Sequence, residues 1–131
     1  MTYYADLTPY AYDRDWAADA TRLWQGAPVV NVGRLDRGRP YEQGVVPSEL
    51  AAVLNRMRHT HRTRQTRGFH FCPLCPSPTS GSYASHPYGS AEIWVRGSDV
   101  AFAAPELIAH YVEAHAYLPP AAFVQAVLAT A

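Results

Sequence analysis

Four residues of the sequence have side chains that commonly bind metal ions, and they fall into two pairs. Cys72 and Cys75 form a CxxC pair, which places two thiols at one turn of the chain. His110 and His115 form an HxxxxH pair further along. Two thiolates and two imidazoles together satisfy the tetrahedral coordination of Zn²⁺. The pattern therefore predicts a zinc site made of Cys72, Cys75, His110 and His115.

Other interpretations of the two pairs stay open. The CxxC pair could be a redox element, or the thiols could be free and the histidines buried as polar core groups. His70 or His86 could replace a predicted ligand. Residues five positions apart differ by about 140° around a regular helix. We therefore expect His115 at a helix end, because Pro119 follows closely and ends a helix.

The motif favours a structural zinc site over a catalytic one. Four protein ligands close the coordination sphere, whereas catalytic zinc usually keeps one position for water. The segment HYVEAH is neither HExxH nor HxxEH, and no HxE motif precedes the CxxC pair. These absences argue against the known zinc hydrolases and deaminases. A closed site would instead contribute on the order of 10 kcal/mol to folding.

Two further residues are the candidates for catalysis, if any occurs. His70 lies two positions before Cys72 and could be a ligand, a partner of a ligand, a general base, or a group packed beside the turn. Glu92 precedes apolar strand residues, and its carboxylate could hold His70 or an arginine, or face solvent. A zinc ion with an open position near His70 and Glu92 would make the protein an enzyme.

The charge of the chain is balanced overall but unevenly spread. Its formal net charge at pH 7 is zero, which excludes a global field that recruits nucleic acid or membranes. Eight arginines against three acidic residues make residues 34–67 basic. We expect this segment to be solvated or to pair with the acidic flanks. Alternatively, it contacts phosphate or an acidic partner, which makes nucleic acid a possible partner through Arg56, Arg58, Arg62, Arg64 and Arg67.

The spacing of apolar and turn-forming residues predicts the elements that position these groups. Residues 1–12 are expected to form an extended arm anchored by Asp6, Tyr10 and Tyr12. Pro47 and Ser48 are expected to cap a helix. The apolar positions of this helix are Leu50, Val53, Leu54 and Met57. Those of a helix near the C-terminus are Phe123, Val124, Val127 and Leu128. The other predictions are helices over 13–25, 106–116 and 120–130, a strand over 28–32, a loop over 34–47 and a hairpin over 91–96 and 99–104.

These elements predict an α+β fold with a small sheet and packed helices around a treble-clef-like zinc nucleus. The order of CxxC turn, hairpin and helix is that of a treble clef, a nucleus found among zinc fingers. The length of 131 residues predicts a single zinc-binding domain over 1–131 with an N-terminal arm. No membrane-length apolar run and no signal segment are present, so we expect a cytoplasmic protein.

Several stretches resemble a family of small, uncharacterised actinobacterial proteins. One departure is Arg34, where the family leads us to expect an aromatic residue. The resemblance implies that the metal motif belongs to a self-standing domain. The stretches that carry it are residues 5–10, 31–38, 65–75, 89–95 and 105–120.

Three functions are compatible with these observations. The leading hypothesis is a zinc-stabilised intracellular binding module that acts on a protein partner, in a regulatory, immunity or accessory role. The second is a small zinc-dependent enzyme of specialised metabolism that uses His70 and Glu92. The third is an arginine-driven nucleic-acid-binding protein.

Overall fold

The computed structural model describes residues 3–10, 27–63, 70–75 and 88–130. For His70 and Tyr88 it describes the backbone alone. The helix expected over 13–25 lies outside these residues, as do Tyr12, Arg64, Arg67 and His86. None of the helices in the described ranges has the length and apolar composition that crossing a bilayer requires.

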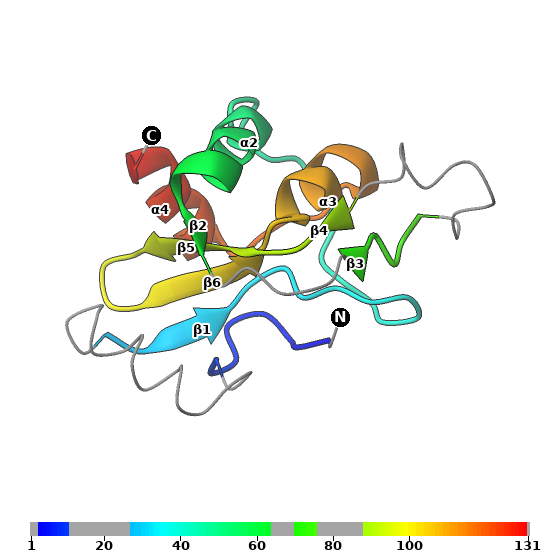
Figure 1. Cartoon of the computed structure of the whole chain (residues 1–131), viewed down its shortest axis with the longest axis horizontal. Coiled ribbons are helices and arrows are strands. Elements are labelled where there is room, and N and C mark those ends of the chain that lie inside the picture. Colours follow the sequence, from blue (N-terminus) through cyan, green and yellow to red (C-terminus); the bar gives the residue numbers. More distant parts are fainter. Residues whose placement is uncertain (1–2, 11–26, 64–69, 76–87, 131) are drawn as a thin grey trace.

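A four-stranded mixed sheet forms the centre of the fold (Figure 1). In spatial order its strands are β1 (Val29–Asn31), β6 (Ala101–Pro105), β5 (Glu92–Arg96) and β2 (Arg62–Thr63). The predicted hairpin is present as β5 and β6, with Trp94 opposite Ala103. The parallel pair is β1 with β6, whereas β5 pairs antiparallel with both β6 and β2.

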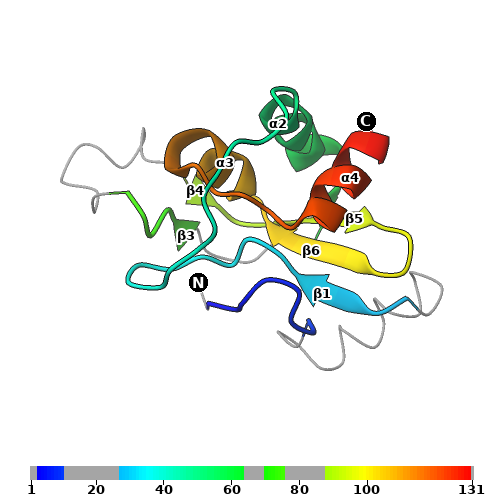
Figure 2. The same cartoon turned by 180° about the vertical axis from the view of Figure 1, so that it is seen from behind.

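A second, two-stranded sheet joins β3 (His70–Phe71) to β4 (Tyr88–Gly89) in antiparallel pairing. Strand β3 ends directly before Cys72, so this small sheet supports the entry to the CxxC turn. It lies at the same end of the molecule as α3 (Ile108–His115), as both side views show (Figures 1 and 2).

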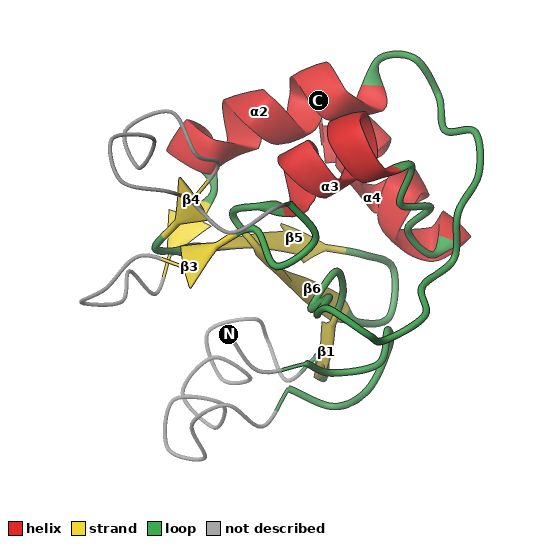
Figure 3. Ribbon diagram, turned by 90° about the vertical axis from the view of Figure 1, so that its right-hand side faces the viewer, coloured by secondary structure: helices red, strands yellow, loops and turns green. Residues whose placement is uncertain are grey.

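Within the described residues, three helices cover one face of the four-stranded sheet, which confirms the predicted α+β class (Figure 3). Besides α3 they are α2 (Leu50–Thr60) and α4 (Ala121–Thr130). The apolar residues predicted for α2 are all buried, but the predicted cap is wrong. Glu49 occupies the N-cap position without a side-chain cap, and the N–H of Leu50 donates to the carbonyl of Pro47 at 3.1 Å. A backbone turn thus replaces the side-chain cap.

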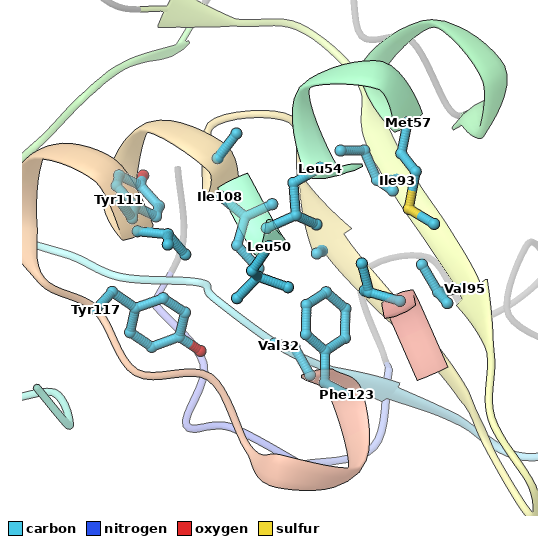
Figure 4. Packing of buried hydrophobic residues seen from close by; sticks show 14 of the residues in the cluster. Val32, Leu50, Leu54, Met57, Ile93, Val95, Ile108, Tyr111, Tyr117 and Phe123 are labelled. Atoms are coloured by element: carbon cyan, nitrogen blue, oxygen red, sulfur yellow. The ribbon is translucent and has the colours of Figure 1, made fainter. Parts of the chain in front are cut away.

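The core lies between the helices and the sheet (Figure 4). Alternation along β5 sends Ile93 and Val95 toward the helices, while Trp94 packs with Tyr10 on the opposite face. In α4, Phe123 packs edge-on against Phe102, with ring centroids 5.6 Å apart. The expected core residue Leu128 is only partly buried. Ala126 is buried in α4 as well.

The N-terminal residues 3–10 run beside β1 on the edge of the sheet. The N–H of Tyr10 donates to the carbonyl of Val29 at 2.9 Å, and the N–H of Asn31 donates to that of Thr8 at 2.8 Å. The carboxylate of Asp6 accepts hydrogen bonds from the N–H of Gly33 and from the hydroxyl of Tyr117. Asp6 thereby joins the N-terminal segment to the chain that follows α3.

Two glycines in left-handed conformations provide a test of packing against backbone strain. Gly33 and Gly38 have φ angles of 76° and 80°. A Cβ at position 33 would lie 3.0 Å from Cδ1 of Ile108, whereas one at position 38 would meet nothing within 4 Å. We expect Gly38→Ala to lower the free energy of unfolding by about 1 kcal/mol through strain, and Gly33→Ala to lower it clearly more. Chemical denaturation measures both losses, and equal values would contradict a packing contribution at Gly33.

Candidate metal centre

The CxxC turn and α3 bring the four predicted ligands together. One donor atom from each of Cys72, Cys75, His110 and His115 lies within 4.8 Å of all the others. The Sγ of Cys75 is 3.3 Å from Nε2 of His110 and 3.4 Å from Nε2 of His115. The Sγ of Cys72 is also 3.4 Å from Nε2 of His115. Zinc bond lengths of about 2.3 Å to sulfur and 2.0 Å to nitrogen give a tetrahedral S···N edge of about 3.5 Å. These residues could therefore bind a metal ion.

The end of α3 explains how two histidines five positions apart can meet. His115 is the last residue of the helix, and Ala116 follows it in the left-handed conformation with φ 53° and ψ 27°. The N–H of Ala116 returns to the carbonyl of Tyr111, which closes the helix. The rings of His110 and His115 consequently lie with their centroids 5.0 Å apart. The expectation that His115 stands at a helix end is confirmed.

Arg37 holds the CxxC turn from a distant loop, a contact that the sequence analysis missed. Its Nε donates to the carbonyl of Pro73 and its Nη2 to the carbonyl of Cys75, both at 3.0 Å. The side chain of Asp36 shapes the loop by accepting the N–H of Arg37 at 2.8 Å. Arg37 lies in the loop predicted over 34–47, but the carbonyl of Pro73 that it contacts is 36 residues further along.

Burial controls the protonation of the groups around the thiols. Cys72 is 3% exposed, and its burial raises the pKa of the thiol to about 11. Binding a metal must therefore displace a proton, so metal affinity falls as the pH is lowered. Burial is the main cause of the raised pKa of Tyr111, and the nearby Cys72 contributes to it. The Tyr111 hydroxyl has no hydrogen-bond partner among the described residues, and it stays protonated as an unused donor.

Glu92 is buried and paired with an arginine, so the alternative in which it faces solvent is wrong. The guanidinium of Arg34 forms an ion pair with its carboxylate. Tyr10 and Trp94 donate to the same carboxylate, at 3.1 and 2.9 Å. The alternation of β5 places Glu92 on the sheet face that carries Trp94 and Tyr10, away from the helices. Within the described ranges, Glu92 is not part of the group that could hold a metal.

Arg34 stands at the position where the family resemblance favours an aromatic residue. Its pairing with Glu92 explains how an arginine can be buried there. It is 6% exposed, and Glu92 supplies the counter-charge that a buried guanidinium needs. No local spacing indicates this pair, because its members are 58 positions apart.

The basic stretch that begins in the second half of α2 and continues into β2 is partly neutralised within the fold. Arg62 forms an ion pair with the buried carboxylate of Glu106, and the Nε of Arg58 lies 4.0 Å from the same carboxylate. The N–H of Ser90 also donates to Glu106, at 2.9 Å. Of the other arginines predicted to contact a partner, Arg56 is exposed. Pairing with acidic residues, one of the expected alternatives, thus applies to Arg58 and Arg62.

The Arg34–Glu92 pair gives a prediction about stability. Glu92→Gln removes the charge and leaves the guanidinium of Arg34 buried without an anion, so we expect a loss of about 3 kcal/mol in unfolding free energy. Adding Arg34→Met should recover much of that loss, because no uncompensated charge remains. Denaturant unfolding of the single and double variants measures both effects. The exposed carboxylate control, Glu49→Gln, should change stability by less than about 0.5 kcal/mol, and a double variant no more stable than Glu92→Gln would contradict the explanation.

Comparisons with known proteins place the chain in a family. A sequence model described as a domain of unknown function, DUF7919, matches residues 2–128, which include all four potential metal ligands. No curated protein and no solved structure matches the chain. Since the match covers nearly the whole sequence, the chain belongs to the DUF7919 family.

Proposed function

We propose that Cys72, Cys75, His110 and His115 hold a Zn²⁺ ion, and that residues 1–131 form one zinc-stabilised domain. The observation that carries this proposal is the convergence of two thiols and two imidazoles. Zn²⁺ accepts this mixed sulfur and nitrogen set in tetrahedral geometry. Four such ligands leave no coordination position for a reacting water, which supports a structural role for the ion.

The function we infer for this domain is binding rather than catalysis. It would act inside the cell, in the cytoplasm, on a protein partner, with a regulatory, immunity or accessory role. The closed ligand set supports this inference, because the metal then maintains the shape of a surface and takes no part in a reaction. The order of CxxC turn, β5–β6 hairpin and α3 supports a treble-clef-like nucleus of the zinc-finger type. An actinobacterial source also stays a prediction.

The two alternative functions have less support. An enzyme using His70 and Glu92 needs an available carboxylate, but that of Glu92 already accepts hydrogen bonds from Tyr10 and Trp94 and pairs with Arg34. A nucleic-acid-binding surface needs free guanidinium groups, but Arg62 is engaged with Glu106.

Removal of one ligand tests the structural role of the metal. We expect the wild-type chain to bind one Zn²⁺, and His110→Ala to lose the ion together with several kcal/mol of stability, because metal-binding energy is folding energy in such sites. Elemental analysis and thermal unfolding measure the two effects. His59→Ala, on the exposed side of α2, is the matched control and should retain both zinc and stability. A wild-type chain that folds equally well in a chelator would contradict the proposal.

Cobalt substitution tests whether the coordination sphere is closed. The Co²⁺-loaded chain should show the visible absorption of a tetrahedral site with thiolate ligands, and added azide should leave that spectrum unchanged. A spectral change that saturates with azide would reveal an exchangeable position. That result would overturn the structural role and favour the zinc-dependent enzyme.

A further inference from the structure

A second candidate site lies between the N-terminal segment and the loop that precedes α2. It is a cavity of about 290 Å³, close to the lower end of the roughly 300 to 1,000 Å³ typical of ligand pockets. None of the four potential metal ligands lines it. The residues that do are Tyr3, Tyr4, Asp6, Leu35, Pro40, Tyr41 and Glu42.

The chemistry of this lining suits an organic cation. Three of the lining residues are tyrosines, whose rings are electron-rich, and Asp6 and Glu42 add two carboxylates, while no basic residue lines the cavity within the described ranges. A cation over an aromatic ring is attracted by the ring quadrupole. The ring of Tyr3 already makes such a contact, because Cζ of Arg39 lies 4.9 Å from its centroid. The two carboxylates still exceed this one guanidinium in charge.

The walls of the cavity are held in place by hydrogen bonds. The hydroxyl of Tyr41 donates to the carbonyl of His115 at 3.0 Å, and its ring packs edge-on against Tyr117. The hydroxyl of Tyr117 donates to Asp6 at 2.8 Å, and the N–H of Gly33 donates to the other oxygen of Asp6 at 2.9 Å. One aromatic ring and one carboxylate of the pocket are therefore positioned before any ligand arrives.

One wall is also attached to the chain that leaves the candidate metal centre. The N–H of Gly44 donates to the carbonyl of Ala116, and the N–H of Leu118 donates to the carbonyl of Glu42. The segment after His115 thus pairs with the segment that carries Tyr41 and Glu42. A metal that holds His115 would stabilise this wall as well.

We propose that this pocket binds an alkylated ammonium group, such as a quaternary amine or a methylated lysine side chain. Methyl groups on the nitrogen contact the tyrosine rings, and the positive charge is balanced by Asp6 and Glu42. This inference rests on the proposed binding function for the kind of partner, and it adds the chemical group that the partner would present. The pocket itself requires only a folded chain.

Choline is a suitable first probe, because its neutral isostere 3,3-dimethyl-1-butanol has the same shape without the charge. The full chain, loaded with zinc, is titrated with each compound at constant ionic strength and followed by NMR. We expect saturable shifts with choline, and binding of the isostere at least about tenfold weaker, from the loss of cation–π and charge contributions. Absence of saturation with choline, or equal binding of the two compounds, would overturn the proposal.

Variants locate the bound cation. Tyr3→Leu and Glu42→Gln should each weaken choline binding by about three- to tenfold. The matched control Glu49→Gln removes an exposed carboxylate outside the pocket and should leave the affinity unchanged. An equal loss in the control would point to general charge screening and would contradict a specific pocket.

A second titration distinguishes the two possible sources of the ammonium group, a methylated protein and a small quaternary amine. A trimethyllysine peptide is compared with the same peptide carrying unmodified lysine, and with choline. Tighter binding of the trimethylated peptide supports a methylated protein partner, whereas tighter binding of choline supports a small quaternary amine. The outcomes are independent of the metal test: a chain that folds without zinc yet binds choline would overturn the zinc proposal alone. A zinc-dependent chain that ignores choline would overturn the pocket alone.

Discussion

Two sulfur atoms from the CxxC turn and two imidazole nitrogens from α3 meet within 4.8 Å, although the two segments are separated by more than thirty residues. Their convergence sets the position of several other parts of the chain. Arg37 binds the carbonyls of Pro73 and Cys75 from one side. The left-handed Ala116 redirects the chain directly after the last potential ligand, His115. A bound cation would form coordination bonds with these four side chains, and the free energy of metal binding would then contribute to folding.

Buried carboxylates organise the rest of the molecule in a similar way. Glu92 joins the N-terminal segment to β5 through Tyr10 and to the loop after β1 through Arg34. Glu106 joins β2 to the start of the α3 region through Arg62. Asp6 is only partly buried, and it links Gly33 to Tyr117 through hydrogen bonds. A buried charge requires partners, so Glu92 and Glu106 each favour one arrangement of distant segments over others.

The candidate metal centre and the tyrosine-lined pocket share a structural connection. The segment after α3 carries Tyr117, which donates to Asp6 in the pocket wall, and the carbonyl of His115 accepts the hydroxyl of Tyr41. A metal at one site would therefore reduce the freedom of side chains at the other. This connection is consistent with a domain in which the ion maintains a binding surface.

Local patterns in the sequence were sufficient to predict α2, α3, α4, the hairpin and the two ligand pairs. The apolar spacing predicted the buried face of α2. The five-residue separation of His110 and His115 predicted that the helix ends at His115, before Pro119. Residue types and local spacing were thus enough to identify the side chains that could bind a metal and the elements that carry them. The pairing of Arg34 with Glu92 and the contact of Arg37 with the CxxC turn are visible only in the folded chain. Helix and strand periodicity acts between neighbours along the chain, whereas the pairing of buried charges depends on which distant segments the topology brings into contact.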